Sequence, residues 1–568
     1  MKYYKRYLIF AAVVIAAAFL KFHIPESGLV QIVKQGDVPM ETDIWNPLIA
    51  SDVNSRELKV QIGGREFTNQ ETGAYMDENL NLMVPAGILQ ESFDCAAHVY
   101  NNNRLVLEKQ NDVLEFSLGE ASIQINDEKE ELSSPMTEQN GEYFVPLAEI
   151  SEGFHYGLEW DVHKNAASAI QKEPEGDHLP SSYDLRERGR TSAVRNQGPF
   201  GTCWAAAALT AIESSILPEE NSYFSVDHMS MNNSFSVDQY DGGDYTMAMA
   251  YLTAWQGPVL EKDDPYGDGV SDSSLTAVKH IQEIQIIEDK DYQAIKDAVF
   301  KYGGVQTSVY STLTNSRSNT PYYNRDTRSY CYIGEEKPNH DVVIIGWDDS
   351  YPKDNFNGEP EGDGAFICQN SWGENFADHG VFYVSYYDSN IGLHNIVYTS
   401  IENADNYDAV YQSDLCGWAG QIGYSHESIY GANVYTAKTA ENLEAAGFYA
   451  VGKNTEYTLY VVKNFEDRHS FADKVQVASG TLSAPGYYTV KFQKDIALEA
   501  GEDFAVVLYI STPGQVHPLA VEYRADDKTA GVILDDGRGY ISARGNNWES
   551  VEETQNCNVC LKAYTKQR

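Results

Sequence analysis

The chain has 568 residues, and at about 150 residues per domain this length predicts three or four domains. It carries 41 Lys and Arg against 84 Asp and Glu, a formal net charge of −43. Neutralising nucleic-acid phosphates or anionic lipid headgroups needs clustered basic residues, so this balance argues against both partners. The hydrophobic share of 42% excludes a disordered acidic tail. The seven cysteines are too few for a disulfide scaffold, and their odd number leaves at least one thiol unpaired.

The first residues have the pattern of an export signal. Residues 1–6 contain three basic groups, and the run from Tyr7 to Leu20 (residues 7–20) has no charge. That run is shorter than the roughly 20 residues that a spanning helix needs, and a basic start before a short apolar stretch is typical of a secretory signal. We therefore predict that residues 1–24 are a signal peptide or an N-terminal membrane anchor. The protein would be exported, either extracellular or at the cell surface. A buried core helix is the alternative, which the basic flank disfavours.

A weak internal duplication follows the signal. Residues 25–54 are mixed and contain proline, as expected of a linker. Within residues 55–172, Leu82–Pro85 and Tyr143–Pro146 are both strand-like, end in Val-Pro and precede a short helical pattern and a hairpin pattern. Two such units resemble the small duplicated domain at the N-terminus of copper amine oxidases, which recurs in exported bacterial proteins. No metal site follows, because the His and Cys residues here form no convincing ligand set.

The central region, residues 178–402, contains a candidate nucleophile. Cys203 stands where a glycine-containing loop meets an alanine-rich helical pattern. The positive end of a helix dipole and its unpaired N–H groups favour a thiolate at such a position. A nucleophilic cysteine also needs a base, and the base needs a group that orients it. His340 opens an apolar strand pattern and Asn370 ends another, so the chain offers both.

In this order and at this spacing, Cys203, His340 and Asn370 resemble the papain-like cysteine peptidases. The resemblance covers about residues 179–388 and implies an α+β fold. It implies that Cys203 is the nucleophile and that His340 is its ion-pair partner and general acid/base. Asn370 would orient the imidazole, and Trp372 would shield their hydrogen bond from water.

The same resemblance assigns residues to the oxyanion and to the substrate. Gln197 would donate its side-chain amide to the oxyanion, together with the backbone N–H of Cys203. Gly242 and Gly243 would pair through their backbone with an extended substrate, and we group Trp372 with these substrate-binding residues. Phe200 stands where the family signature has a cysteine, so the usual nearby disulfide is absent and packing must replace it.

Each of these residues alone has an ordinary structural explanation. A cysteine beside a tryptophan usually belongs to the core, and a histidine before a strand is usually a cap. Their joint occurrence in the right order makes this explanation poor. We expect no metal and no cofactor. The acidic loop at residues 348–363 matches no calcium ligand spacing, and the Cys557–Cys560 pair lacks a second ligand pair.

The C-terminal region, residues 405–566, has short alternating strand patterns separated by turns, which predict an antiparallel β-sandwich. It resembles the lectin-like domain that follows the peptidase in a bacterial subset of the papain-like family. This resemblance implies binding of cell-surface carbohydrate. Trp418, Tyr424 and Trp548 are candidate contacts, although aromatic residues on a sandwich more often pack than bind.

Together the patterns predict a multidomain protein. An α+β papain-like peptidase core would follow a small duplicated α+β domain and precede a C-terminal antiparallel β-sandwich. The expected function is that of an exported cysteine endopeptidase acting on proteins or peptides. Two alternatives stay open: a surface adhesin or cell-wall-binding protein with a vestigial peptidase fold, and an acyl transferase or wall-peptide hydrolase with the same Cys-His chemistry.

Overall fold

The computed structural model describes residues 31–34 and 53–568, with gaps at 63–64, 78, 94, 101–102, 110–111, 126–127, 133, 140, 155, 162–164, 172–178, 314–316 and 536. The expected signal segment at residues 1–24 lies outside the described residues, as does most of the linker. The chain forms two compact units, one of Ile44–His178 and one of Met1–Asp43 with Leu179–Arg568. Among the described residues, no helix is long and apolar enough to cross a bilayer.

The unit at residues 44–178 contains the expected duplication. In each copy a strand ends in Val-Pro and leads into a short helix and a further strand. The elements are β5 (Leu82–Pro85), α4 (Ala86–Phe93) and β6 (Ala96–Tyr100), then β12 (Glu142–Pro146), α5 (Leu147–Gly153) and β13 (Tyr156–Asp161). β5 and β12 pair antiparallel, with Val84 opposite Val145. Equivalent residues of the two copies are therefore direct partners, and both side chains are fully buried.

The other elements of this unit complete its sheets. They are β2 (Lys59–Ile62), β3 (Arg65–Thr68), α3 (Asn69–Thr72), β4 (Tyr75–Met76), β7 (Arg104–Lys109), β8 (Asp112–Ser117), β9 (Ser122–Ile125), β10 (Glu128–Glu131), β11 (Thr137–Gln139) and β14 (Ala166–Gln171). Buried side chains from both copies, including Leu89, Phe93, Leu147 and Ile150, pack into one core. The two copies thus form a single folded body.

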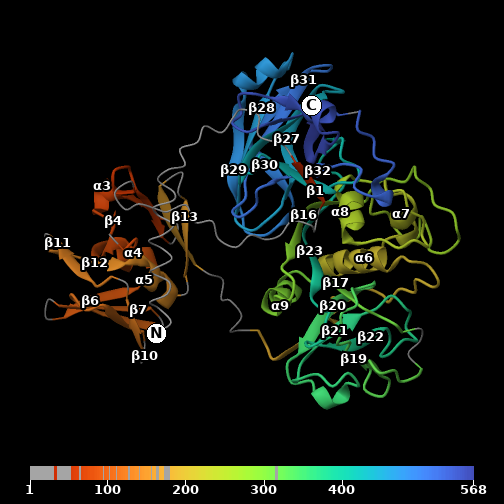
Figure 1. Ribbon diagram of the computed structural model, residues 1–568, viewed down its shortest axis with the longest axis horizontal. Coiled ribbons are helices and arrows are strands. Elements are labelled where there is room, and N and C mark those ends of the chain that lie inside the picture. The colour runs from red at the N-terminus through yellow and green to blue at the C-terminus, as the bar shows by residue number, and fades with distance from the viewer. Residues whose placement is uncertain are drawn as a thin grey trace. The chain divides into compact units, whose positions relative to one another are not determined.

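The region predicted to be a peptidase, residues 178–402 and called the peptidase region below, places helices against a sheet. Helix α6 (Cys203–Ile216) contains a run of alanines after its first two residues, and alanines favour helix and are small enough for close packing. It lies between α7 (Val226–Met231) and α8 (Tyr245–Thr253) on one side and β17 (Val305–Val309) and β20 (His340–Asp348) on the other (Figure 1). The further elements are β15 (Ser182–Asp184), η1 (Leu185–Arg188), β16 (Lys279–Ile287), α9 (Tyr292–Lys301), β18 (Tyr323–Asn324), β19 (Ser329–Tyr330), η2 (Lys353–Asn355), β21 (Ala365–Gln369), β22 (Val381–Ser385) and β23 (Leu393–Asn403).

The C-terminal region is the expected antiparallel sandwich. Its core contains Phe448, Leu459, Phe504, Leu508 and Leu561, all buried. One layer is a sheet of order β29-β28-β31-β26-β33-β34, and the other contains β30, β27, β36 and β24. The elements are β24 (Ala409–Tyr411), β25 (Gly420–Gly423), β26 (Ser428–Thr436), β27 (Glu441–Ala450), β28 (Thr455–Val462), η3 (Arg468–Asp473), β29 (Val475–Leu482), β30 (Gly486–Leu498), β31 (Asp503–Ser511), β32 (Leu519–Glu522), η4 (Asp527–Thr529), β33 (Gly539–Ser542), β34 (Glu549–Ser550), α10 (Val551–Thr554), β35 (Asn558–Val559) and β36 (Leu561–Gln567).

One sheet runs from the peptidase region into this sandwich, a connection that the sequence patterns did not predict. The seam lies between β16 and β30, where Ile284 pairs with Tyr487 and Gln285 with Gly486. Gly486 has a φ of +147°, and a Cβ atom there would lie 1.9 Å from the carbonyl oxygen of Ile284. This close approach therefore requires glycine. The two regions are therefore joined by backbone hydrogen bonds as well as by the covalent chain.

A short strand within the expected linker also joins the C-terminal region. This strand, β1 (Gln31–Lys34), pairs antiparallel with β25 in a small sheet of order β1-β25-β32-β35. Residues near the start of the chain thus extend a sheet built from its end.

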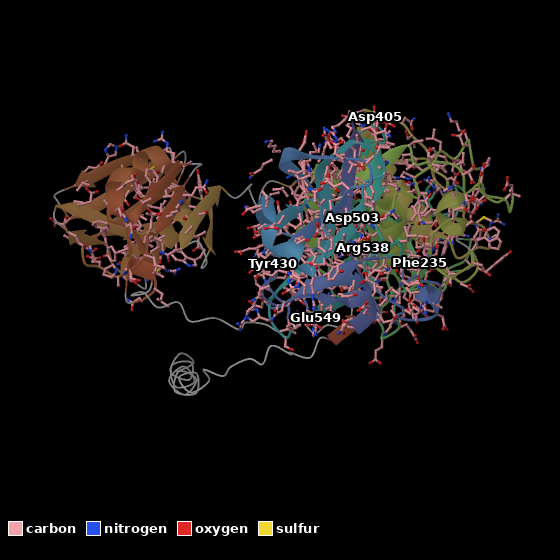
Figure 2. All side chains as sticks on the ribbon, turned by 90° about the horizontal axis from the view of Figure 1, so that it is seen from above. Phe235, Asp405, Tyr430, Asp503, Arg538 and Glu549 are labelled. Atoms are coloured by element: carbon pink, nitrogen blue, oxygen red, sulfur yellow. The ribbon has the colours of Figure 1, made fainter. Side chains whose placement is uncertain are left out.

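A second contact between the peptidase and C-terminal regions lies beside the predicted glycine pair. Phe235, which is labelled in Figure 2, packs against Cys416, Val532 and Leu534. The Lys528 ammonium donates to the Asp244 carboxylate at 2.8 Å. Asp244 directly follows Gly242 and Gly243, so the C-terminal region contacts the edge of the predicted substrate groove.

Candidate active site

The candidate nucleophile, Cys203, is the first residue of α6. It is partly exposed, whereas the other six cysteines are buried. Burial and the nearby Asp341 carboxylate raise the pKa of its thiol to about 12, against the opposing effect of hydrogen bonds from the backbone N–H groups of Asp341, Trp204 and Cys203 itself. The helix position that favours a thiolate is thus opposed by burial, and the thiol form is preferred.

The candidate base, His340, is held by a single strong contact. Its Nε2 lies 2.7 Å from Oδ1 of Asn370. Because an amide oxygen can only accept, Nε2 carries the proton and Nδ1 is left as the basic nitrogen. The Trp372 ring lies over the imidazole, with centroids 4.8 Å apart. Burial lowers the pKa of His340 to about 4, although the Asn370 hydrogen bond opposes this shift. The imidazole is therefore neutral.

Strand pairing explains why these distant residues meet. β20 and β21 are antiparallel neighbours, with Val343 opposite Gln369. The start of β20 and the end of β21 therefore lie at the same edge of the sheet, which brings His340 beside Asn370. Helix α6, which begins at Cys203, packs against β20.

The loop before α6 holds Gln197 in place. Its Oε1 accepts from the Ser371 hydroxyl at 2.6 Å, and its backbone N–H donates to the Ser371 carbonyl at 2.8 Å. Its Nε2 donates to the Phe200 carbonyl at 2.8 Å, which uses one of its two N–H groups. The other remains for an oxyanion. Ser371 positions this amide, and sequence reasoning missed it because its role depends on a contact across the fold.

Aromatic packing stands where the family has a disulfide. The Phe200 ring lies 5.0 Å from that of Tyr240 and 6.0 Å from that of Tyr266. The Tyr266 hydroxyl donates to the Gln197 carbonyl at 2.8 Å. All seven cysteines are free, so this cluster supports the loop through packing, as expected.

The predicted glycine pair has a backbone geometry that requires glycine. Gly242 has a φ of +78°, and a Cβ atom on Gly243 would lie 2.5 Å from Nε1 of Trp204. Within the described residues, the backbone N–H and C=O of Gly243 have no partner. Asp244 then caps α8 by accepting from the Thr246 N–H at 3.0 Å.

Two of the three C-terminal aromatic candidates are packed inside the domain. Trp418 and Trp548 are buried, and Trp548 stacks on Phe471 with centroids 4.1 Å apart. Tyr424 donates its hydroxyl to Glu549 at 3.1 Å. Trp548 and Glu549 also line a cavity of about 820 Å³, so this side of the sandwich is the better candidate for a ligand.

A carboxylate of the acidic loop at residues 348–363 forms an ion pair and a hydrogen bond within the fold. Asp349 pairs with Lys296 at 2.6 Å and accepts from the Tyr386 hydroxyl at 2.6 Å. In the part of the chain that the structure describes, no group of His, Cys, Asp and Glu side chains could hold a metal ion.

Three family models match the chain: the papain family cysteine protease over residues 179–401, the copper amine oxidase N-terminal domain over 54–168 and the lectin like domain over 410–565. Residues 179–401 are similar to the papain family cysteine proteases. All three resemblances seen in the sequence are confirmed, and they support a cysteine-type peptidase.

The solved structures of clostridial Cwp84 share both the peptidase and the C-terminal region. The cysteine protease and lectin-like domains of Cwp84, a surface layer associated protein of Clostridium difficile, are 26% identical with a TM-score of 0.60, over 69% of this chain and 89% of that one. Cwp84 after propeptide cleavage gives the same identity and TM-score, over 68% of this chain and 100% of that one.

The curated relatives match a smaller part of this chain. A viral cathepsin of Choristoneura fumiferana nuclear polyhedrosis virus is 24% identical over 247 residues, 42% of this chain and 69% of the relative. Mouse cathepsin K is 24% identical over 210 residues, 36% of this chain and 58% of its own length. The cathepsin similarity therefore supports the peptidase region.

Proposed function

We propose that this protein is an exported cysteine endopeptidase of the cell surface, with Cys203 as nucleophile and His340 as general acid/base. The observation that carries the proposal is the His340–Asn370 hydrogen bond under Trp372, beside a partly exposed thiol at a helix start. Export is supported by the signal-like pattern of residues 1–24, and the cell-surface location by the surface layer association of Cwp84.

In the proposed first step, Nδ1 of His340 takes the thiol proton as Sγ attacks the carbonyl carbon of the scissile bond. The C–S bond forms, and the carbonyl electrons move onto oxygen. The oxyanion receives hydrogen bonds from the Gln197 amide and the Cys203 N–H. Because burial raises the pKa of Cys203 and lowers that of His340, proton transfer accompanies attack. The C–N bond then breaks, and the amine leaves with the proton from His340.

The second step releases the acid and restores the enzyme. Water gives a proton to His340 as its oxygen attacks the thioester carbon. The C–O bond forms, the C–S bond breaks, and the sulfur recovers its proton from the imidazolium. Asn370 keeps the ring in one orientation through both steps, and Trp372 keeps water from the hydrogen bond that does so.

The flanking regions are assigned to localisation. The proposal places catalysis in residues 178–402, carbohydrate binding in residues 405–566 and a spacing role in residues 55–172, with membrane anchoring through residues 7–20 if the signal is retained. The cavity of about 820 Å³ supports the carbohydrate assignment, because its lining combines Tyr540 with the charged side chains of Arg538 and Glu549. The last two lie on the C-terminal region in Figure 2.

The test of the catalytic assignment combines labelling with turnover. Full-length protein is treated with a thiol-directed epoxide, the labelled residue is located by mass spectrometry, and a fluorogenic peptide library is assayed. We expect the label on Cys203, because the other cysteines are buried. Cys203→Ala should lower kcat/KM by at least about 1,000-fold, and Gln197→Ala should lower kcat by about 100-fold.

The matched control is Cys95→Ala, which removes a buried thiol of the other unit and should keep both labelling and turnover. Equal turnover by Cys203→Ala would contradict the proposal. Labelling without peptide cleavage favours the acyl transferase. Binding of the chain to cell walls without any labelling favours the adhesin. For the carbohydrate assignment, Arg538→Ala should weaken binding of Cys203→Ala protein to cell-wall glycans by about tenfold.

A further inference from the structure

The cavity of about 820 Å³ in the C-terminal region has a strongly acidic lining. Six carboxylates line it, against two guanidinium groups. The carboxylates belong to Glu466, Asp467, Asp535, Glu549, Glu552 and Glu553. A hollow lined by charges of one sign concentrates their field, so this cavity attracts cations.

Much of this negative charge has no counterion in the protein. The Arg538 guanidinium is committed to the Asp503 carboxylate, which lies outside the lining, at 2.7 Å. Counting Arg468 as well leaves the lining negative. Within the described residues, no Lys or Arg nitrogen lies within 4.0 Å of the carboxylates of Asp535, Glu549 and Glu553. A cationic group of a ligand would therefore meet carboxylates that are not yet paired with a cation.

An aromatic surface forms another part of the lining. Phe465, Tyr540 and Trp548 all line the cavity, and the first two have ring centroids 6.1 Å apart. The rings of Tyr540 and Trp548 pack on the buried Phe471, with centroid distances of 5.3 and 4.1 Å. These side chains form a continuous aromatic cluster. Such a cluster suits a ligand ring with apolar C–H faces and a polar edge, as a pyranose has.

Two buried polar groups at this cavity have no hydrogen-bond partner in the part of the chain that the structure describes. One is the indole N–H of Trp548, a side chain that is 5% exposed. The other is Oδ1 of Asn558, which is fully buried behind Gly537 of the lining. A Cβ atom on Gly537 would lie 3.2 Å from that oxygen. An unpaired buried donor and acceptor cost free energy that ligand hydroxyls, which both donate and accept, can recover.

We infer that this cavity binds a glycan with free amino groups, such as glucosamine units that lack their acetyl groups. The inference rests on the proposed carbohydrate function of residues 405–566 and names its ligand class. The protonated amines pair with the carboxylates of Asp535, Glu549 and Glu553. The sugar faces pack on Tyr540, and the hydroxyls accept from Trp548 and from the N–H groups of Arg538 that do not bond Asp503.

The same arrangement disfavours an acetylated glycan. An N-acetyl group carries no charge, so an acetylated glycan offers the carboxylates no cation and must displace water from them without compensation. The aromatic and hydroxyl contacts are common to both glycans. The carboxylates therefore set the preference, and the other contacts contribute to the affinity for either ligand.

The experiment compares glucosamine oligomers with N-acetylglucosamine oligomers of the same length. Isothermal titration calorimetry measures both affinities for full-length Cys203→Ala, in a buffer that keeps the amines protonated. We expect the glucosamine oligomer to bind at least about tenfold more tightly, and this preference should shrink as salt is added. In Asp535→Asn/Glu553→Gln, which changes two exposed side chains, the preference should fall to about twofold or less.

The matched control is Asp405→Asn/Asp495→Asn. It removes two exposed carboxylates of the same region that do not line the cavity, and Asp405 lies well away from Glu549 in Figure 2. This control should keep the full preference. An equal loss in both double variants would show that only the overall charge of the region matters, and would overturn the inference.

The remaining outcomes separate this inference from the proposed function. Equal affinities for the two oligomers, or a preference that survives Asp535→Asn/Glu553→Gln, overturn the inference and leave the carbohydrate assignment standing. If neither oligomer binds, the inference also fails, and binding of Cys203→Ala to whole cell-wall glycans then tests the carbohydrate assignment by itself. Tighter binding of oligolysine than of the glucosamine oligomer would assign the cavity to a basic peptide and overturn the inference. Peptide turnover by the wild-type chain tests the peptidase proposal independently of all these results.

Discussion

Two seams in this molecule, each a pair of strands that joins two regions, both form by antiparallel strand pairing. They differ in whether the joined regions are copies of one repeat. In the unit at residues 44–178, β5 pairs with β12 and joins two copies of one repeat, with Val84 opposite Val145. In the other unit, β16 pairs with β30 and joins two unlike regions, with Gln285 opposite Gly486. The first seam is symmetric and is held by buried side chains. The second is asymmetric and depends on backbone approach at one glycine.

The difference shows how strand pairing can be specified. A repeat can pair with itself because both strands have the same pattern of buried apolar side chains, and burial of matched residues sets the register. Unlike regions share no such pattern. Their register is set by a local steric condition, here the absence of a side chain where the Ile284 carbonyl oxygen approaches.

The largest expected effect comes from breaking the asymmetric seam. In Gly486→Ala the new Cβ atom would lie 1.9 Å from the Ile284 oxygen at a φ of +147°. We expect the unit of residues 179–568 to lose more than about 3 kcal/mol of unfolding free energy. Denaturant unfolding of the full chain, with hydrogen exchange to assign each transition, measures this loss.

The control for this prediction is Gly501→Ala, where φ is +81° and nothing lies within 4 Å of the added atom. This substitution should cost only about 1 kcal/mol, from backbone strain alone. Equal losses for the two variants would show that the seam does not depend on close approach.

A smaller effect is expected at the symmetric seam. Val84→Ala and Val145→Ala each remove buried methyl groups and should each cost about 2 kcal/mol in the unit at residues 44–178. The two losses should agree within about 0.5 kcal/mol, because the residues are equivalent partners. Val99→Ala, at a side chain that is 46% exposed, should cost less than about 0.5 kcal/mol. Clearly unequal losses at positions 84 and 145 would contradict the symmetry.

The remaining prediction is a pH dependence of the larger unit, whose change within one pH unit is smaller than the losses above. Burial raises the pKa of Glu522 from 4.5 to about 8, partly opposed by the hydrogen bond from the Cys416 N–H. The folded state therefore keeps a proton that the unfolded state releases, so this stabilisation is complete below pH 4.5 and is lost as the pH rises through about 8. Between these values, stability should fall by roughly 1 kcal/mol per pH unit.

Glu522→Gln provides the comparison for this titration. Thermal unfolding of both chains across the same pH range should show the decline in the wild type and a flatter profile in the variant. An unchanged slope in Glu522→Gln would assign the pH dependence to other groups.

Local patterns allowed much of the fold to be predicted. The Val-Pro steps marked both copies of the repeat because proline has no N–H group to donate and is confined to the ends and edges of strands. The alanine run of α6 and the alternating strands of the sandwich are similarly local. The seams of β16 with β30 and of β1 with β25 were not predicted, because backbone hydrogen bonds between distant strands leave no residue signature. Pro485-Gly486 is typical of an ordinary turn.

In the candidate site, too, local sequence patterns identified some residues and missed those that act through contacts between distant elements. Cys203, His340, Asn370 and Gln197 were identified from spacing, since a catalytic order along the chain is visible in the sequence. Ser371 was missed because its role comes from a contact between elements. Asp341 directly follows His340, but only the fold shows that its carboxylate accepts hydrogen bonds from Ser308 and Gln306.

The sheet shared through β16 and β30 also fixes the distance between the C-terminal region and the candidate nucleophile. Hydrogen-bonded strands cross the boundary between the peptidase and C-terminal regions without a hinge. A glycan held by the C-terminal region would therefore keep Cys203 at one fixed height above the surface that carries that glycan. Tethering would raise the effective concentration of the enzyme for peptide bonds at that height, and not for bonds at other heights.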